Sequence, residues 1–553
     1  MHKKIFKIIK IAVLSISLFL ALFITYLFFA TSLKEPSPED RSIENRAPVH
    51  IDGSLYIFGD SWIRKSRSGL WEMYIQGDPY ERGVAAGKLS AHLVSLQEKY
   101  FIDQIEEMIP SKAYLNILKL FVAWFNRDLD HYIKDEYLAE IYGISRSAPD
   151  EYDYIGPKYQ RMLNYHGAHD IGHALVNMKL VGCTSFSVKG DLTSDGKMLI
   201  GRNFDFNMGD DFTKDKIIAF YAPSSGHKYM MVTWGGMTGV VSGMNDAGLT
   251  ITINAAENDI PRSVATPIAI IAKEILQYSG DISEAYAIAR NRNSFVAESM
   301  MIGSAKDKKT VIIEKKPDKT DLYDPESNIV ISTNHFLKNR VPYPEESSVY
   351  RYNRVAELLS KRKKINHSDV ASILRDMKGM GGTDIGYGNE KTINQFVAHH
   401  SIIFKPEDLM VWVSTSPYQL GEYAAYDLKK IFSGYKILKK DIEIYESSGI
   451  IPESGILKTG EYKRIAESKK YTGQIKAAIS DIDDQSFDTG KIESYIQTNP
   501  EMYLVYQLVG DLYFSRNDLK NAEKYYLIAI TKEIPRLSER EKINESLKKC
   551  KRI

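Results

Sequence analysis

The hydrophobic and polar positions along the chain divide it into stretches of different periodicity. An uncharged apolar run fills residues 11–30. Alternating and helical patterns share residues 51–182, strand-like patterns dominate residues 183–433, and helical patterns return after residue 486. The chain therefore predicts one large globular region between an apolar N-terminal segment and a helical C-terminal extension.

The apolar run near the N-terminus has the length of a bilayer span. The lysines that precede it keep that end in the cytoplasm, so everything after the run is expected outside. We therefore expect a cytoplasmic basic tip at 1–10, a single-pass transmembrane anchor at 11–30 and a linker at 31–50. A cleaved signal peptide, which would release a secreted protein, is the alternative, although Phe29-Ala30-Thr31-Ser32 is a poor cleavage site.

The middle of the chain is dominated by short apolar or alternating runs, which are typical of strands. They lie at 54–59, 70–76, 184–188, 198–200, 219–221, 228–234, 240–242, 249–254, 299–303, 309–315, 328–333, 401–404 and 410–414. Helical patterns lie at 97–108, 114–125, 135–143, 267–276, 282–289 and 351–359. Strands enclosed by helices in this order favour an α+β fold in which stacked antiparallel sheets are covered by helices on both faces.

The C-terminal part has a different character. Residues 434–485 are rich in Lys and Glu and indicate a linker with a helix that leads into a helical domain at 486–553. Eight positions match the spacing of a tetratricopeptide repeat (TPR): Tyr506, Val509, Gly510, Tyr513, Ala522, Tyr526, Ala529 and Pro535. Because a single repeat cannot bury its own face, we expect this TPR-like pair to pack on flanking helices or to bind a protein partner.

Cys183 is one of only two cysteines in the chain. By itself a free cysteine usually behaves as a small buried hydrophobe. Here, however, it precedes a predicted hairpin that turns at Asp195-Gly196 and returns to the segment Gly201-Arg202-Asn203-Phe204-Asp205. Such a hairpin brings a cation and a carboxylate beside the thiol, as thiolate chemistry requires.

Several motifs, taken in order, resemble those of the N-terminal-nucleophile (Ntn) hydrolases of the linear-amide type. This family includes choloylglycine hydrolases, penicillin acyltransferase and, more distantly, acid ceramidase. The motifs are Gly182-Cys183-Thr184, Gly201-Arg202-Asn203-Phe204-Asp205, the segment 243–249 that runs into Asn254, Ser332-Thr333-Asn334 and Ser347-Ser348-Val349-Tyr350-Arg351. The resemblance covers about residues 51–428. It implies a four-layer αββα sandwich, with a propeptide or α-chain at 51–182 and a hydrolase core at 183–433.

The resemblance also implies self-cleavage between Gly182 and Cys183. Its catalytic set corresponds here to Cys183, Arg202, Asp205, Asn254, Asn334 and Arg351. Cleavage would give the cysteine a free α-amine, whose pKa near 8 lets it take the thiol proton within the same residue. Asp205 would hold the protonated amine, Arg202 would favour the thiolate, and an Asn amide with a backbone N–H would stabilise the oxyanion. Trp234, Asn245, His399 and His400 are further candidates for contact with substrate.

Two other interpretations stay open. A Cys/His peptidase could use His399 or His400 as its base, and an inactive membrane-tethered scaffold could display the TPR-like pair. The polar residues of the motifs also have ordinary roles available, as a surface ion pair, as turn residues or as an exposed helix position. A cut before Cys183 would separate these interpretations.

Charge and motif content limit the possible partners. The formal net charge is +1 with acids and bases interspersed, so nothing indicates nucleic acid. The sequence has no nucleotide-binding fingerprint and no HExxH or CxxC motif, so we expect no cofactor and no essential metal. The chain therefore predicts an autocatalytically processed cysteine amidohydrolase or acyltransferase, with its catalytic part extracytoplasmic. It would act on the linear amide bond of a small N-acyl substrate through a thioester on Cys183.

Overall fold

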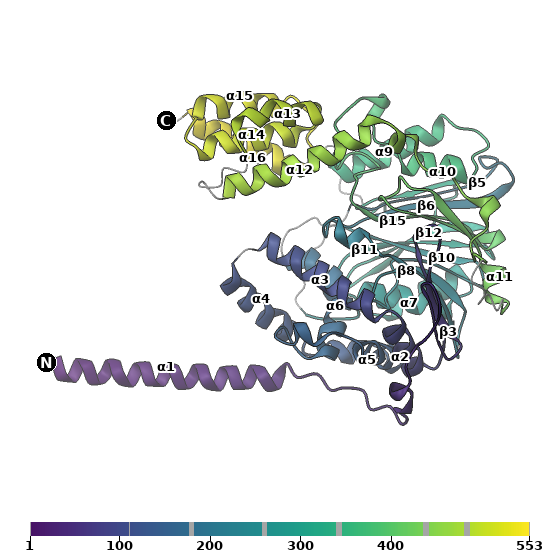
Figure 1. Cartoon of the computed structure of the whole chain (residues 1–553), viewed down its shortest axis with the longest axis horizontal. Helices are drawn as coiled ribbons and strands as arrows, with labels where there is room; N and C mark the ends of the chain where they lie inside the picture. Colours follow the sequence, from purple (N-terminus) through teal and green to yellow (C-terminus); the bar gives the residue numbers. More distant parts are fainter. Residues whose placement is uncertain are drawn as a thin grey trace.

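The protein is a sandwich of two β-sheets between layers of helices (Figure 1). The computed structural model describes residues 2–109, 111–175, 182–256, 263–338, 346–434, 442–480 and 487–551. Apolar side chains fill the space between the sheets, with Ile200 and Phe404 from one sheet packed among Phe220, Met230 and Met301 from the other. This layering agrees with the α+β sandwich expected from the order of strands and helices.

The larger sheet has eleven strands, and it combines segments from both sides of Cys183. Their order is β1 (Val49–Asp52), β2 (Leu55–Phe58), β3 (Ser61–Lys65), β4 (Trp71–Gly77), β7 (Ile217–Pro223), β8 (Tyr229–Thr233), β9 (Ser242–Asn245), β10 (Leu249–Ala255), β11 (Glu298–Ser304), β12 (Lys309–Lys315) and β13 (Thr320–Tyr323). The neighbours β4 and β7 pair in parallel. A backbone ladder therefore joins a strand that precedes Cys183 to one that follows it.

The smaller sheet has six strands, all paired antiparallel. Their order is β14 (Ile329–Ser332), β5 (Thr184–Gly190), β6 (Gly196–Asp205), β15 (Ala398–Lys405), β16 (Met410–Ser414) and β17 (Tyr423–Asp427). The strands β5 and β6 form the predicted hairpin. Its turn includes Gly196 with φ +78°, a conformation that favours glycine.

Helices cover the outer faces of both sheets. On the larger sheet lie α2 (Pro79–Leu89), α3 (Ala91–Met108), α4 (Lys112–Phe125), α5 (Asp135–Ser145), α6 (Lys158–Leu175), α7 (Ile268–Tyr278) and α8 (Ile282–Asn291). On the smaller sheet lie α9 (Ser347–Ser360) and α10 (His367–Leu374), where Val370 and Leu374 pack against Phe186 and Leu199. The short helix α11 (Leu428–Phe432) follows β17.

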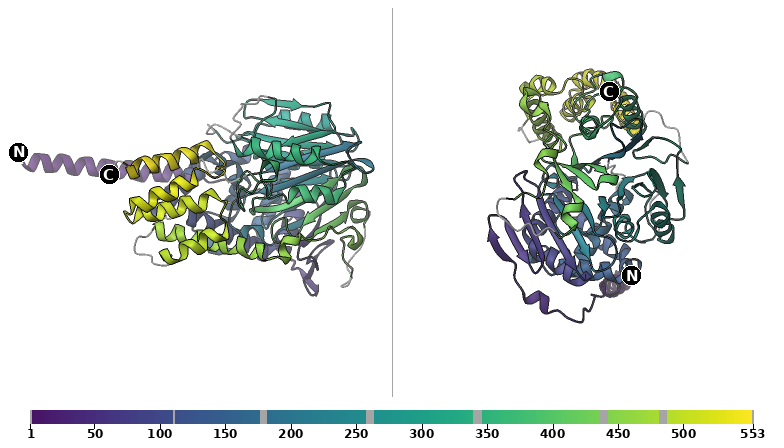
Figure 2. Two further views of the ribbon diagram at one scale, coloured as in Figure 1. Left: turned by 90° about the horizontal axis from the view of Figure 1, so that it is seen from above. Right: turned by 90° about the vertical axis from the view of Figure 1, so that its right-hand side faces the viewer.

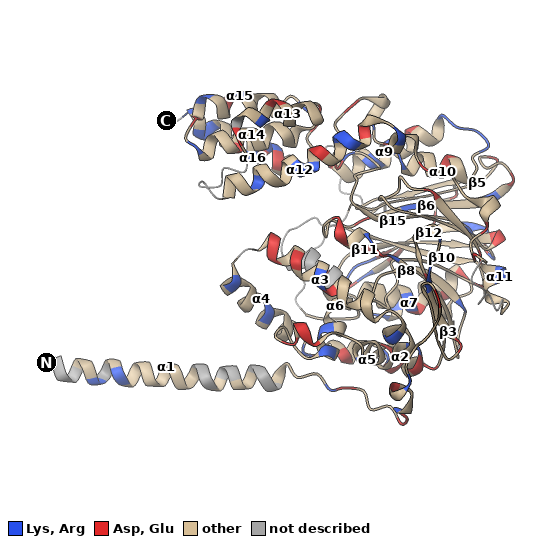
Figure 3. Ribbon diagram, in the orientation of Figure 1, with Lys and Arg blue, Asp and Glu red and all other residues tan. Residues whose placement is uncertain are grey.

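Charged residues are spread over the covering helices, whereas the residues of the strands are mostly uncharged (Figure 3). Arg202 and Asp205 are exceptions, because both are buried within the smaller sheet. A buried charge is costly unless it is paired or hydrogen-bonded. These two residues therefore need specific partners, and their partners define the candidate site.

The N-terminal expectation is corrected by the structure. Residues His2–Ala30 form the helix α1, but within the part of the chain that the structure describes, no helix combines the length and the apolarity that a membrane crossing needs. That requirement is about twenty consecutive, predominantly apolar residues. The predictions of a transmembrane anchor at 11–30, of a membrane partner through it, and of a single-pass protein with an extracytoplasmic catalytic part were therefore wrong.

The C-terminal extension is a group of helices at one side of the sandwich (Figure 2). It contains α12 (Gly460–Ser480), α13 (Ile492–Thr498), α14 (Tyr503–Ser515), α15 (Leu519–Ala529) and α16 (Leu537–Lys551). Gly510 on α14 lies against the ring of Tyr526 on α15, where an added Cβ would come within 2.7 Å of the ring. The predicted helical pair is present, and its buried face packs on the flanking helices. Its assignment as a TPR stays a prediction.

Candidate active site

The hairpin β5–β6 brings the Arg202 guanidinium to the Cys183 thiol. In its register Ser185 lies opposite Arg202, and Thr184 lies opposite Asn203. Since side chains alternate along a strand, Cys183 and Arg202 share the face between the two sheets. Arg202 Nη2 lies 3.4 Å from Cys183 Sγ, and both side chains are fully buried.

Backbone carbonyls from the larger sheet fix the Arg202 side chain. Its Nη2 donates to the carbonyl oxygen of Ile253 at 2.6 Å, and its Nη1 donates to that of Val241 at 3.1 Å. The hydroxyl of Ser242 accepts a further hydrogen bond from Nη1. The guanidinium also lies over the ring of Phe204, 4.5 Å from its centroid. The positive charge is therefore held rigidly in front of the thiol.

Burial and the neighbouring positive charge shift the pKa of the Cys183 thiol in opposite directions. Burial raises the pKa of Cys183 to about 11, although the neighbouring Arg202 lowers it. In the uncut chain the thiol is therefore protonated at neutral pH, and it needs a base before it can act as a nucleophile.

Asp205 lies on the other face of the same strand, beside the backbone of Gly182. The backbone N–H of Gly182 donates to the carbonyl oxygen of Asp205 at 3.0 Å. Burial raises the pKa of the Asp205 carboxyl to about 7, although Arg351 and Arg202 lower it. Among the described residues Asp205 Oδ1 has no hydrogen-bond partner. A buried carboxyl oxygen without a hydrogen bond lowers the stability of the fold. This oxygen can accept a hydrogen bond from a donor that the uncut chain does not yet have.

Arg351 on α9 holds the backbone of Cys183. Its Nη1 donates to the Cys183 carbonyl oxygen at 2.5 Å and to Thr184 Oγ1 at 2.8 Å. Its Nη2 donates to Asn334 Oδ1 at 2.8 Å, and Asn334 Nδ2 in turn donates to the carbonyl oxygen of Ala255 at 2.8 Å. Arg351 and Asn334 therefore fix the start of β5 and have no hydrogen bond to the thiol among the described contacts.

Asn254 lies on β10, across the sandwich from β5. Its Nδ2 donates to the carbonyl oxygen of Ser332 at 3.0 Å, and its Oδ1 accepts from Ser185 Oγ at 3.1 Å. The side chain is buried in the space between the sheets, where Ser185 shares the face of Cys183. Nδ2 also donates to Ser332 Oγ at 3.3 Å, so both acceptors of this amide belong to Ser332.

Of the two adjacent histidines, His400 lies next to Arg202, and His399 lies next to His400. His400 Nε2 lies 2.8 Å from Ser242 Oγ and 3.4 Å from Arg202 Nη1, and the Nδ1 atoms of His399 and His400 are 2.9 Å apart. Burial lowers the pKa of both imidazoles well below the usual range. Within the described ranges no hydrogen bond joins either imidazole to Cys183.

Asn245, a predicted substrate contact, is committed to the fold instead. Its Nδ2 donates to the carbonyl oxygens of Leu276 and Ser279 at the end of α7, at 2.9 and 2.7 Å. Its Oδ1 accepts from the backbone N–H groups of Ala247 and Leu249. The acceptors lie at the C-terminal end of α7, and the donors lie in the turn after β9 and at the start of β10. The structure does not bring Asn245 to the thiol.

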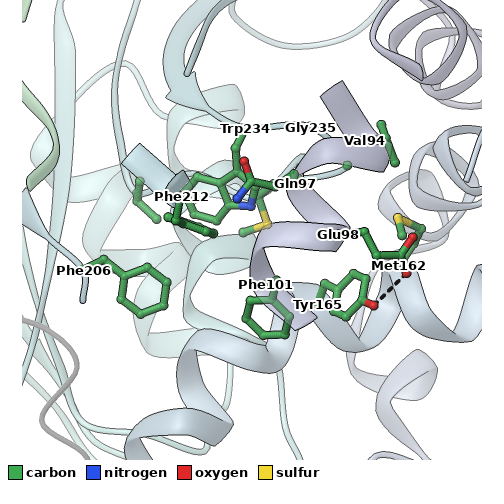
Figure 4. A pocket seen from close by; sticks show the side chains of 13 residues that line it. Val94, Gln97, Glu98, Phe101, Met162, Tyr165, Phe206, Phe212, Trp234 and Gly235 are labelled. Atoms are coloured by element: carbon green, nitrogen blue, oxygen red, sulfur yellow. Dashed lines mark hydrogen bonds between the residues drawn. The ribbon is translucent and has the colours of Figure 1, made fainter. Parts of the chain in front are cut away.

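An apolar pocket adjoins the site (Figure 4). Trp234 is part of its wall, and α3 and α6 supply the opposite side. A contact between Trp234 and substrate stays a prediction. The lining residues are Val94, Gln97, Glu98, Phe101, Met162, Tyr165, Phe206, Phe212, Trp234, Gly235, Gly236, Met237 and Val241. Val241 is also the residue whose carbonyl accepts from Arg202. The pocket therefore ends next to the group that faces the thiol.

Two contributors to the site were missed at the sequence level. Gln395 Nε2 donates to the Gly182 carbonyl oxygen at 2.8 Å and lies 3.5 Å from Asp205 Oδ2. Ser242 contacts both Arg202 and His400. Gln395 is 213 residues from Gly182 and belongs to no recognisable motif, so only the folded chain brings the two together.

No metal site accompanies this cluster in the part of the chain that the structure covers. There, no group of three or more His, Cys, Asp or Glu side chains is arranged to hold a metal ion.

Part of the chain matches a known protein family. Residues 192–416 match the family described as AAT: Acyl-coenzyme A:6-aminopenicillanic acid acyl-transferase. The matched region begins after Cys183 and contains Arg202, Asp205, Asn254 and Arg351. The match supports an enzyme of the amide hydrolase and acyltransferase class.

Two curated proteins are similar over part of the chain. An uncharacterized protein of Archaeoglobus fulgidus is 25% identical over 345 residues, which cover 54% of this chain and 56% of that protein. Protein dcd1B of Dictyostelium discoideum is 22% identical over 308 residues, which cover 52% of this chain and 58% of that protein. The chain thus spans a little more than half the length of these curated relatives.

Solved structures give more distant likenesses. A Caenorhabditis elegans orthologue of N-acylethanolamine-hydrolyzing acid amidase has a TM-score of 0.32 and 15% identity, covering 41% of this chain and 93% of that one. A mutant conjugated bile acid hydrolase from Clostridium perfringens has a TM-score of 0.31 and 15% identity, covering 45% of this chain and 93% of that one. Likenesses of this size identify no activity.

Proposed function

We propose that the protein is an autocatalytically processed cysteine amidohydrolase or acyltransferase that forms a thioester on Cys183. The observation that carries this proposal is the buried Cys183 thiol at 3.4 Å from the Arg202 guanidinium, directly after Gly182. A thiol in contact with a fixed cation gains stability as a thiolate. The family match to acyltransferases supports the same class of reaction.

The chemistry begins once the Gly182–Cys183 bond is cut. Cys183 then has an α-amine with a pKa near 8, which takes the proton from the thiol of the same residue. Asp205 Oδ1, which has no hydrogen-bond partner among the described residues, is available to hold the resulting ammonium group. Arg202 stabilises the thiolate. One residue would thus supply both nucleophile and base.

Acyl transfer follows in two steps. The thiolate attacks the carbonyl carbon of the substrate amide, and the oxyanion accepts a hydrogen bond from the Asn254 amide in place of the longer one to Ser332 Oγ. The Cys183 ammonium group gives its proton to the leaving nitrogen, the C–N bond breaks, and the acyl group remains on sulfur as a thioester. Water or an amine then attacks the thioester and restores the thiol.

The pocket indicates the kind of acyl group. Its wall is formed largely by aromatic and aliphatic side chains, including Phe101, Phe206, Phe212 and Trp234. Burying an apolar side chain or acyl group there contributes about 25 cal/mol per Å² of surface removed from water. We therefore propose a small N-acyl amide with an apolar acyl part as the substrate.

The contacts of His399 and His400 give less support to the alternative function, a Cys/His peptidase. Arg202 lies next to both the thiol and His400 Nε2, and Ser242 also contacts that nitrogen. An imidazole whose pKa is held far below its usual range takes up a proton poorly. The inactive scaffold likewise gives no reason for a buried cation to face a buried thiol.

A trapping experiment tests the thioester. The purified protein is mixed with a panel of N-acyl amides, quenched in acid and examined by mass spectrometry. We expect one acyl group on Cys183, released by hydroxylamine, in the wild type and in the Cys550→Ala control, because Cys550 is the other free cysteine and lies in the helical extension. Amide turnover without any acylated Cys183, or unchanged turnover in Cys183→Ala, would refute the proposal.

A further inference from the structure

The carbonyl group of Gly182 has one side-chain hydrogen bond among the described contacts, and it comes from Gln395. Gln395 Nε2 donates to the Gly182 oxygen at 2.8 Å. This oxygen belongs to the peptide bond that joins Gly182 to Cys183. The Gln395 side chain is buried, and its Nε2 also lies 3.5 Å from Asp205 Oδ2. The Gln395 amide therefore lies between the Gly182 carbonyl group and the Asp205 carboxyl group.

The close contact between the Gln395 amide and the Gly182 carbonyl requires glycine at position 182. A Cβ added at position 182 would lie 2.6 Å from Gln395 Oε1 and 2.7 Å from Gln395 Nε2. Any side chain there would displace the flexible end of Gln395 from the carbonyl. The need for glycine before Cys183 thus follows from this contact as well as from backbone freedom.

The segment around Gln395 is fixed independently of Gly182. The backbone N–H of Asn394 donates to the carbonyl oxygen of Asp376 at 2.9 Å, and the Asn394 side chain accepts from the backbone N–H of Phe396 at 3.1 Å. Phe396 has φ +55°, a conformation that is disfavoured for residues other than glycine. A local strain maintained next to a reactive bond is typical of functional positions.

We propose that Gln395 is the catalytic residue that stabilises the oxyanion when the chain cuts itself between Gly182 and Cys183. This inference rests on the proposed function. Cys183 Sγ turns from Arg202 towards the carbonyl carbon of Gly182, where the carboxylate of Asp205 lies beside the Gly182 backbone. The carboxylate takes the thiol proton, and Sγ forms a bond to the carbonyl carbon. The carbonyl oxygen then carries the negative charge, and the hydrogen bond from Gln395 Nε2 strengthens as the charge develops.

The intermediate then collapses towards a thioester. The C=O bond re-forms, the bond from carbon to the Cys183 nitrogen breaks, and Asp205 returns the proton to that nitrogen, which becomes the α-amine. Water attacks the thioester, giving the carboxyl group of Gly182 and the free thiol of Cys183. Gln395 thus acts on the Gly182 carbonyl in the first step, whereas Asn254 is assigned to the substrate carbonyl in the finished enzyme.

The test measures the cleavage itself. Full-length chains are synthesised in a cell-free system, and the uncut fraction is followed by intact mass. For Gln395→Glu, which keeps the shape but cannot stabilise an oxyanion when ionised, and for Gln395→Met, we expect cleavage to slow by about a hundredfold or more. Thermal melting of the uncut chains checks that both variants are folded.

Hydroxylamine distinguishes the step that is affected, because it attacks thioesters but not ordinary peptide bonds. If Gln395 acts on the first step, hydroxylamine leaves the slow cleavage of the variants unchanged. Fast cleavage of a folded variant, or slow cleavage that hydroxylamine restores to the wild-type rate, would overturn the inference. A wild-type chain that stays uncut would overturn the proposed self-cleavage as well, so the two failures are distinguishable.

A double-mutant cycle provides a second readout. Gly182→Ala displaces the same amide, so Gln395→Met should have little additional effect in a Gly182→Ala background. Multiplicative effects of the two substitutions on the cleavage rate would contradict the direct contact between Gln395 and the reacting carbonyl.

Discussion

At the scale of single residues, burial raises the pKa values of the two titratable groups beside the Gly182–Cys183 bond. Burial raises the pKa of the Cys183 thiol to about 11, so the thiol is protonated at pH 7. The Asp205 carboxyl has its pKa raised to about 7 by the same cause, so it exchanges a proton near neutrality. The uncut chain is therefore a weak nucleophile with a usable base nearby.

Arg202 should be essential for turnover. Arg202→Lys keeps the charge but loses the combined contacts with Cys183 Sγ and the carbonyl oxygens of Ile253 and Val241. We expect kcat/KM for an N-acyl amide to fall by about a hundredfold or more. Arg362→Ala, in the turn after α9, is the control. An unchanged kcat/KM in a normally melting Arg202→Lys protein would remove Arg202 from the site.

The rate of self-cleavage should depend on pH through Asp205. Because burial raises the pKa of this carboxyl to about 7, the acid form dominates below that pH and cannot accept the thiol proton. Cleavage should therefore accelerate as pH rises through about 7, and Asp205→Asn should be slow at every pH. Cell-free synthesis at pH 5.5 to 8.5 measures this. A flat wild-type profile would contradict the role of Asp205 as base.

At the scale of elements, short-range patterns were predictable and long-range contacts were not. The β5–β6 hairpin followed from alternating residues and the Asp195-Gly196 turn, so the pairing of Arg202 with Cys183, 19 residues apart, could be predicted. The contact between Arg351 and the Cys183 carbonyl spans 168 residues, and only the family resemblance indicated that Arg351 was important. Asn245 shows the converse, because its motif was recognised but its amide caps α7.

The pocket should determine acyl preference. Trp234→Ala removes a large apolar part of its wall, so kcat/KM for amides with long or aromatic acyl groups should fall by about tenfold or more, while acetyl amides change little. Trp124→Ala, on the exposed side of α4, is the matched control. An equal loss for acetyl and long-chain amides would place Trp234 outside the acyl pocket.

The helical extension contacts the segment that supports Arg351. Arg351 Nε donates to the Glu390 carbonyl oxygen at 3.1 Å, while the Glu390 carboxylate pairs with Arg536, directly before α16 of the extension. The neighbouring Lys391 pairs with Glu533 at 2.6 Å. The extension therefore packs on the back of the site through charged contacts that involve buried side chains.

Removing one of these contacts should affect the reaction from a distance. Arg536→Ala leaves the mostly buried Glu390 carboxylate without its ion-pair partner, a change that shifts or destabilises its segment. We expect kcat/KM to fall by about tenfold, whereas Lys532→Ala, which removes an ion pair with Glu501 inside the extension, should have little effect. Equal rates for the two variants would show that the extension does not support the site.

At the scale of the whole molecule, the segment before Cys183 is an integral part of the sandwich. The parallel ladder of β4 with β7 joins it to the larger sheet, and α2 and α5 pack into the same apolar core as β10 and β11. If the chain is cut at Gly182, both fragments should therefore elute together in gel filtration under native conditions and separate only in denaturant. Separation of the fragments in native buffer would contradict this packing.

The central claim is that Cys183 becomes the N-terminal residue of the active enzyme. Intact mass and N-terminal sequencing of the purified wild-type protein test it most directly. The account predicts two fragments, the larger beginning at Cys183, and a single uncut, inactive chain for Cys183→Ala. An active enzyme that remains one uncut chain, or that is cut far from Cys183, would exclude the α-amine as base and contradict the account.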